Sequence, residues 1–220
     1  MKKIAVVLCG SGYRDGSEIR ESVAVLWALS QHPVSVDCFA PNEPQHDVVN
    51  CLTGQTVSGE TRNMLVEAAR IARGKVRPLT ELDPQSYNGI VLPGGFGVAK
   101  NLCTFATQGS KGSVHPRLKE VLQAMHTQHK PIGAVCIAPA VVALAFAGKH
   151  FELTVGAASE ASAEIEKLGH KHVVTPVTAC HVDEDNAVIT TAAYMYDNAI
   201  LHELFQGVGE LVREVVKRLR

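Results

Sequence analysis

The sequence predicts an α/β fold: a doubly wound, mostly parallel, flavodoxin-like sheet with helices on both faces. Short β-branched runs alternate with stretches of helical periodicity, as they do in consecutive βαβ units. The chain has 220 residues, enough for one well-buried layered domain. No repeat, low-complexity tract or linker divides it, so we expect a single domain over residues 1–220.

The first third of the chain contains the clearest elements. Ile4–Leu8 is an apolar run that ends at a glycine pair, and Val34–Ala40 is a β-branched run that ends at Pro41; both predict strands. Between them, helical spacing predicts a helix over Ser17–Ser30. We expect its core-facing side to carry the apolar residues Ile19, Val23, Leu26 and Trp27.

The middle of the chain begins with a long excursion. Residues 41–60 have no clear period. A helix is expected over Glu60–Arg73, with Gly74 in the C′ position. Apolar runs then predict strands at Gly89–Leu92 and Pro131–Cys136, separated by an amphipathic helix over Pro116–His129.

The last third continues the alternation. An alanine-rich run predicts a helix over Val141–Ala147, and Asp197–Leu219 is a long closing helix. We expect strands at Leu153–Val155, Val173–Val174 and Val188–Thr191, the last preceded by a polar turn at residues 181–186.

Charge and composition exclude several classes of protein. The formal net charge is −1 and no basic stripe is present, so we expect no nucleic-acid partner. No apolar stretch is long enough to cross a membrane. The N-terminal apolar run is too short for a signal peptide, and no arginine-rich presequence precedes it, so we expect a cytoplasmic protein.

The cysteines, the histidines and the first glycine-rich segment give no sign of disulfides, a metal or a cofactor. The six cysteines are scattered without a C-x-x-C pair, which indicates reduced thiols. The ten histidines form no metal-binding pattern, and His170 and His172 are expected to face solvent rather than a metal. The glycine-rich segment at residues 10–16 has the spacing G-x-G-x-x-x-G and no acid ends the second strand, so we expect no nicotinamide and no other cofactor.

Cys136 is the most informative residue. It lies between a strand and a helix, with the small residues Ala134 and Ala138 two positions before and after it. Such neighbours are what the tight turn of a nucleophile elbow requires, and the following helix would favour the reactive thiolate. The other interpretation is a buried structural cysteine, and these residues alone leave both open.

Two further segments fall at carboxyl ends of strands, where ligands bind in such sheets. Pro93–Gly97 leads to Asn101. Taken alone it is a tight turn, but beside an elbow cysteine the N–H groups of Gly94, Gly95 and Ile137 would form an oxyanion hole. Glu18 begins the first helix, as a helix-terminal acid or as a proton carrier for Cys136. Glu21 is its rival and Asp15 a weaker one.

These blocks together resemble the DJ-1/PfpI superfamily of the class I glutamine amidotransferase-like fold. The closer resemblance is to the ES1/ElbB branch (enhancing lycopene biosynthesis protein 2, described as a glyoxalase). It rests on four segments spread over nearly the whole chain: 15–19, 60–74, 93–102 and 136–139. It implies a homodimer, Cys136 as the elbow nucleophile, Glu18 as its carboxylate partner, and Asn101 near the substrate.

The sequence departs from the family at the histidine. Protease-like members have a histidine directly after the cysteine, where Ile137 stands here. In DJ-1-like members a histidine lies about one strand further on, where Gly156 or Ala157 stands. Without a nearby base, amide hydrolysis is disfavoured. His150 and His181 are the nearest candidates, and neither matches the pattern.

Three functions therefore compete. The first is a cofactor-independent glyoxalase acting on small 2-oxoaldehydes, which need less activation of the nucleophile than amides. The second is a non-catalytic oxidation sensor built on Cys136, if its thiolate is accessible. The third is a glutaminase-type amidotransferase. We favour the first.

Overall fold

The computed structural model describes residues 1–220 and has at its centre a seven-stranded sheet in the order β10-β11-β7-β6-β1-β2-β5. Six strands are parallel, and the edge strand β10 runs antiparallel to β11. The predicted doubly wound, mostly parallel sheet is confirmed. Its strands are β1 (Lys2–Val7), β2 (Val34–Ala40), β5 (Val76–Pro78), β6 (Gly89–Leu92), β7 (Ile132–Val135), β10 (Cys180–Asp183) and β11 (Val188–Thr191).

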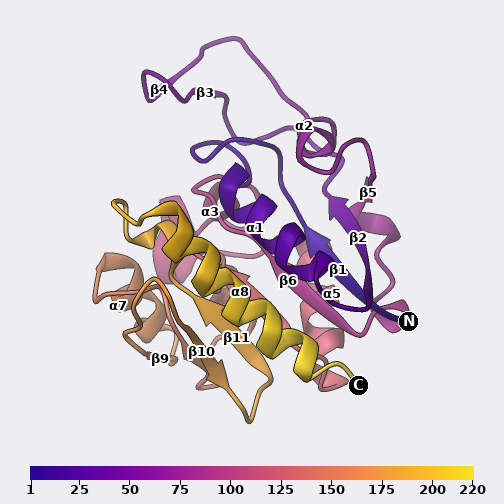
Figure 1. The fold of residues 1–220 in the computed structure, drawn as a ribbon. Helices are drawn as coiled ribbons and strands as arrows, with labels where there is room; N and C mark the ends of the chain where they lie inside the picture. Colours follow the sequence, from indigo (N-terminus) through magenta and orange to yellow (C-terminus); the bar gives the residue numbers. More distant parts are fainter.

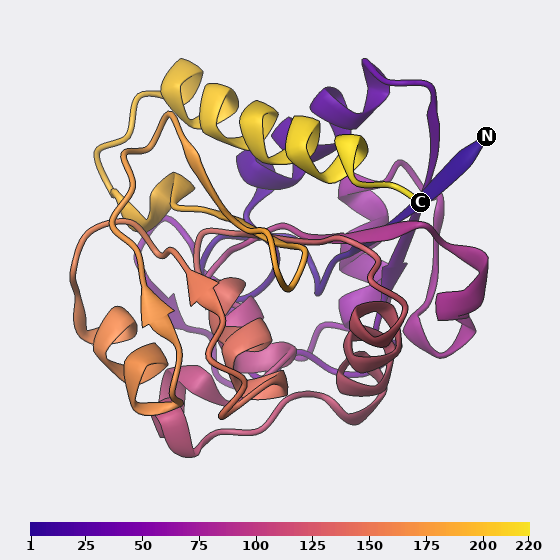
Figure 2. The same cartoon turned by 90° about the horizontal axis from the view of Figure 1, so that it is seen from below.

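Helices cover both faces of this sheet. Figures 1 and 2 show α1 and α8 side by side over one face, while α5 and α6 pack against the other. The helices are α1 (Ile19–Ser30), α2 (Met64–Ile71), α3 (Val98–Asn101), α4 (Phe105–Gln108), α5 (Pro116–Thr127), α6 (Pro139–Ala145), α7 (Glu160–Lys167) and α8 (Leu201–Lys217). Short 3₁₀ turns are η1 (Leu79–Glu81), η2 (Pro84–Ser86), η3 (Gly109–Lys111) and η4 (Ala193–Met195). No helix combines the length and the apolar character needed to cross a bilayer.

The late strands differ from the prediction. β8 (Glu152–Leu153) and β9 (Lys171–His172) pair with each other in a small separate sheet. The edge strands β5 and β10 were not predicted, because both are only partly buried and lack a continuous apolar run. In the excursion, β3 (Val49–Asn50) and β4 (Gln55–Thr56) form a short hairpin, drawn at the top of Figure 1.

Helix ends show smaller differences. The residue after the C-cap of α2 is Arg73, with a φ of 52°, and Gly74 follows it with a φ of 79°. Gly74, which was predicted at C′, is therefore at C″, and Arg73 occupies C′. His170 is buried rather than solvent-facing, because its ring accepts the Phe151 N–H and lies 2.9 Å from the Ala143 carbonyl.

The buried face of α1 is not the predicted one. Ile19, Val23 and Trp27 are between 44% and 51% exposed. The residues that face inward are Glu21, Ser22, Ala24, Val25, Ala28 and Leu29. Three of these six, Ser22, Ala24 and Ala28, are small, which lets the helix lie close to its neighbours. The exposed stripe contacts α8 instead, where the Trp27 ring lies 5.6 Å from the ring of Phe205.

The sheet order brings the three suspected strand ends together. β1, β6 and β7 are neighbours, so the segments that follow them meet at one edge of the sheet. The Glu18 N–H donates to the Gly94 carbonyl at 2.8 Å, and the Phe96 N–H donates to the Tyr13 carbonyl at 2.7 Å. A Cβ on Gly97 would lie 2.2 Å from the Gly16 nitrogen, so this close approach of two backbones requires glycine.

Candidate active site

Cys136 occupies a strained turn directly after β7. Its φ is 62°, a left-handed conformation that is costly for a residue with a side chain. Its N–H donates to the Thr191 carbonyl at 2.9 Å, and α6 begins three residues later at Pro139. Ala134 and Ala138 are completely buried on either side. The predicted elbow geometry is therefore present.

The predicted glycine loop lies against this thiol. The backbone N–H groups of Gly95 and Ile137 lie near the Cys136 thiol and lower its pKa. A Cβ on Gly94 would lie 2.4 Å from the Cys136 Cβ and 2.5 Å from Glu21 Oε2. Gly94 is thus required for a close approach of the thiol and a carboxyl group.

That carboxyl group belongs to Glu21. Its Oε1 accepts the Tyr194 N–H at 3.1 Å, whereas Oε2 is buried without a hydrogen-bond partner of ordinary geometry. The groups that Glu21 faces besides Tyr194 are the Cys136 thiol and the Gly94 N–H. Burial, and secondly the negative charge of Glu18, raise the pKa of Glu21 to about 8.

Glu18 has a different place from the predicted one. It is the N-cap of α1, and its Oε2 accepts the Glu21 N–H at 2.6 Å. Burial raises its pKa, and Cys136 is not among the groups that act on it. The carboxylate that contacts the thiol is therefore Glu21, the rival in the sequence, because the rotation of α1 turns residue 21 toward the sheet.

The thiol is also less acidic than the sequence suggests. Burial raises the pKa of Cys136 well above its usual value, and the charge of Glu21 raises it further. The N–H groups of Gly95 and Ile137 lower it, but by less. Only 7% of the residue is exposed. The expectation of a low-pKa, accessible thiolate is wrong in this structure, and the sensor hypothesis loses the property on which it depended.

Asn101 does not present its amide to the thiol. Its Nδ2 donates to the carbonyls of Cys9 and Asp15, and its Oδ1 accepts the His46 N–H at 2.8 Å. The Asp15 carboxylate in turn accepts the Val49 N–H at 2.9 Å. Both side chains fix the excursion to the loop after β1, so the predicted contact of Asn101 with substrate is replaced by a structural one.

No histidine takes the family's position. Gly156 has a φ of 88°, and a Cβ there would lie 2.9 Å from the Tyr196 ring. The space for a side chain at residue 156 is therefore filled by Tyr196. His150 contacts the Gly169 carbonyl, and His181 contacts Glu152 at 3.0 Å. Neither is among the groups around Cys136.

The turn η4 was not predicted from the sequence. Ala193 has a φ of 42°, and the Tyr194 N–H that follows it contacts Glu21. A signal was available: these residues follow β11, which neighbours β7, and ligand sites in such sheets lie beyond the carboxyl ends of strands. Ala192 and Ala193 have no polar side chain, and the contact with Glu21 is made by a backbone N–H, so the residue types gave no indication of a role in the site.

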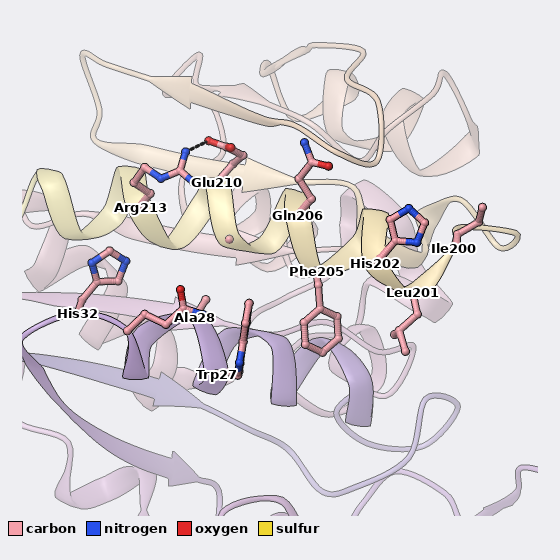
Figure 3. Close-up of a pocket in the computed structure, with 12 residues that line it drawn as sticks. Trp27, Ala28, His32, Ile200, Leu201, His202, Phe205, Gln206, Glu210 and Arg213 are labelled. Carbon is pink, nitrogen blue, oxygen red and sulfur yellow. Dashed lines mark hydrogen bonds and ion pairs between the residues drawn. The ribbon is translucent and has the colours of Figure 1, made fainter.

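A separate groove lies between α1 and α8. Figure 3 shows Trp27 from α1 and Phe205 from α8 facing each other across it, with the Glu210–Arg213 ion pair at 2.6 Å farther along α8. Its volume is about 780 Å³. Ile200 and Leu201, at 57% and 45% exposure, extend its apolar lining. The groove shares helix α1 with the Cys136 site but none of its side chains.

Comparison with known proteins identifies the family. The model of the DJ-1/PfpI family matches residues 2–203. The chain belongs to the DJ-1/PfpI family. A human family relative, glutamine amidotransferase-like class 1 domain-containing protein 3, mitochondrial, is 42% identical over 98% of this chain and 82% of its own length. The ES1 protein homolog, mitochondrial, of Rattus norvegicus is 40% identical over 98% of this chain and 83% of its own length.

A solved family structure agrees with the fold. An isoprenoid biosynthesis protein with an amidotransferase-like domain from Ehrlichia chaffeensis has a TM-score of 0.91 and 38% identity, with all of both chains covered. The predicted resemblance to the DJ-1/PfpI superfamily and its ES1 branch is thereby confirmed. The cytoplasmic prediction is contradicted, because both named relatives are mitochondrial proteins. The apolar run used for it is the buried strand β1, which carries no information about location.

Proposed function

We propose that the protein is a cofactor-independent glyoxalase that converts glyoxal or methylglyoxal to the 2-hydroxy acid. The observation that carries the proposal is the closed group of Cys136, Glu21 and the N–H donors of Gly95 and Ile137. A buried acid whose pKa is near neutral suits a reaction that needs it to give and to take a proton in turn.

The first step is addition of the thiol to the aldehyde. The Cys136 sulfur forms a bond to the aldehyde carbon while its proton passes through Glu21 to the aldehyde oxygen, giving a hemithioacetal. Glu21 is ionised when this step begins: it takes up the thiol proton, gives it to the aldehyde oxygen and is ionised again at the end. The N–H groups of Gly95 and Ile137, which lie near the thiol, would stabilise charge on the adjacent oxygen as it develops.

Proton transfer between carbons follows. Ionised Glu21 removes the proton from the hemithioacetal carbon, giving an enediolate, and returns it to the neighbouring carbon. The hydroxyl proton of the former aldehyde oxygen moves to the neighbouring oxygen, which gives a thioester of the 2-hydroxy acid. Water then cleaves the thioester and restores the thiol. The net change is addition of one water molecule to the 2-oxoaldehyde, with no oxidant or reductant.

The direct test is turnover of glyoxal and methylglyoxal with product identification. We expect Cys136→Ala to abolish formation of glycolate and lactate, because no sulfur remains to carry the adduct. Cys9→Ala, at a second buried strand-end thiol, is the matched control and should retain turnover. Normal turnover in Cys136→Ala would refute the proposal.

The glutaminase alternative has less support. The human relative carries the words glutamine amidotransferase-like in its name. In this chain no histidine faces Cys136, so the leaving amine would have only Glu21 as a proton donor. Release of glutamate from glutamine that depends on Cys136 would revive it.

The family resemblance also implies a homodimer. We infer that a second copy covers the groove between α1 and α8. Exposed apolar side chains line it, and Glu210 and Arg213 offer both signs of charge to a copy related by a two-fold axis. Sedimentation analysis of the wild type and of Trp27→Ser tests this: a wild-type monomer would contradict it.

A further inference from the structure

Glu21 is held by a turn that none of the site motifs includes. The turn η4 begins after β11, and Ala193 within it has a φ of 42°. Strained residues of this kind persist only where the surrounding structure enforces them, and they gather at functional sites. Cys136 is the other strained residue of this site, so two unfavourable backbone conformations lie next to Glu21.

The turn η4 provides one N–H group to the Glu21 carboxyl group. Tyr194 donates it to Glu21 Oε1 at 3.1 Å, which leaves Oε2 as the oxygen without an ordinary partner. A buried oxygen without a donor is least costly when it carries a proton itself. The proton of the carboxyl group is therefore directed to Oε2, the oxygen that lies close to the Cys136 Cβ across Gly94.

An exposed residue in turn holds the Tyr194 side chain in place. Its hydroxyl oxygen accepts a hydrogen bond from Arg20 Nη1 at 2.9 Å. Arg20 is exposed and lies on α1 next to Glu21 itself. The same helix thus supplies the carboxyl group and the residue that fastens the turn against it.

We propose that the Arg20–Tyr194 pair is a clamp that orients the Glu21 carboxyl group so that its proton faces Cys136. Arg20 and Tyr194 are positioning residues: they act on Glu21 and contact no reacting atom. The proposal rests on Glu21 and Cys136 being the reacting pair of the proposed function. The charged or titratable groups that act on Glu21 are Glu18, at the start of α1, and Cys136, after β7.

The test uses the resting protein and needs no aldehyde. Alkylation of Cys136 by iodoacetamide is followed by mass spectrometry across pH, with the exposed Cys51 as an internal reference. Tyr194→Phe removes the hydroxyl but keeps the charge of Arg20, and Arg20→Lys keeps the charge but loses the planar guanidinium. We expect both to raise the alkylation midpoint of Cys136 by roughly half to one pH unit, because the proton is no longer confined to Oε2.

A matched control is present in the chain. Arg14 Nε donates to the Tyr13 hydroxyl at 2.9 Å, an exposed Arg–Tyr pair that does not act on Glu21 or Cys136. Tyr13→Phe should leave the midpoint unchanged. The clamp is refuted if Tyr194→Phe keeps the wild-type midpoint, or if Tyr13→Phe moves it equally. It is also refuted if Arg20→Gln moves the midpoint while Arg20→Lys does not, since charge alone would then be responsible.

The two proposals fail separately. Aldehyde turnover tests the glyoxalase reaction, and alkylation of the resting thiol tests the clamp. A protein without turnover whose alkylation midpoint still shifts in Tyr194→Phe would retain the clamp and lose the reaction. Heat unfolding of each variant shows whether it is folded, and Arg20 is exposed, so its variants keep the test available if Tyr194→Phe fails to fold.

Discussion

Cys9 and Cys136 are both buried cysteines that follow parallel strands, β1 and β7, of the same sheet. Burial raises the pKa of both, that of Cys9 to about 12. Their neighbours differ. Cys9 meets the hydroxyl of Ser17 and the amide of Asn101, whereas Cys136 meets the Glu21 carboxyl group and two backbone N–H groups.

Cys9 and Cys136 have similar positions in the sheet but different chemical surroundings. A cysteine at the carboxyl end of a strand is common to both positions, and so is burial. Only Cys136 stands in a left-handed turn beside a group that can exchange a proton with it. We infer that the partner, rather than the acidity of the free thiol, distinguishes the reactive cysteine.

The strongest way to break this difference is to fill the gap between thiol and acid. Gly94→Ala places a Cβ 2.4 Å from the Cys136 Cβ and 2.5 Å from Glu21 Oε2. We expect turnover to fall by about 100-fold or more, since displacement of reacting groups by about 1 Å has that effect. Overpacking should also cost about 1–3 kcal/mol of stability, seen as a lower Tm.

Gly209→Ala is the control for that substitution. Nothing in the same chain lies within 4 Å of a Cβ at Gly209, which is in the interior of α8 and lines the groove between α1 and α8 rather than the Cys136 site. Its Tm should be unchanged or slightly higher, because alanine favours a helix over glycine. Equal losses in both variants would mean that the contact at Gly94 is not the cause.

The next test removes the proton carrier alone. Glu21→Gln keeps the shape of the side chain, and we expect turnover to fall about 100-fold or more because acid–base transfer is lost. Glu18→Gln keeps an oxygen able to cap α1 and should lose much less. Steady-state rates with methylglyoxal compare the two. A larger loss in Glu18→Gln would restore the assignment made from the sequence.

The last effect is on stability across pH and is measured as Tm rather than as turnover. The pKa of Glu21 is raised from its ordinary 4.5 to about 8, so folding holds a proton that the unfolded chain releases. Its contribution to stability is complete below pH 4.5 and is lost as pH rises through about 8. The Tm of the wild type should therefore fall relative to that of Glu21→Gln between pH 5 and about 8.

The exposed Glu60 provides the reference for this measurement. Heat unfolding of Glu60→Gln should follow the wild type across the same pH range. If the wild type and Glu21→Gln differ by a constant amount at every pH, the buried acid does not carry the proton assigned to it.

Much of the site could be predicted because it depends on local geometry. The strand, the small residues around Cys136 and the glycine loop are all visible in the sequence, and the strand order brings them together. Asn101 was predicted to contact substrate, whereas its amide binds backbone groups that are distant in the chain. These groups belong to Cys9, Asp15 and His46. No local pattern shows that these backbone groups occupy its amide.

The choice of Glu18 over Glu21 and the wrong choice of helix face follow from one assumption about how α1 is rotated. Choosing Ile19, Val23 and Trp27 as the core stripe fixes a rotation of α1 that turns Glu21 outward. The face that is buried carries Val25 and Ala28, and Glu21 lies one turn before Val25 on that same face. The large apolar side chains of Ile19, Val23 and Trp27 suggested the buried face of α1, but they are exposed. The face that is buried includes the small residues Ser22, Ala24 and Ala28.

The 7% exposure of Cys136 has a consequence for which molecules react with it. An attacking compound must reach the sulfur through a very small opening or wait for its neighbours to move apart. Rates for a series of electrophiles should then rank by molecular size before they rank by intrinsic reactivity. The narrow access would select compounds by size before they react. Small aldehydes would reach the sulfur, whereas bulky oxidants and bulky alkylating agents would not.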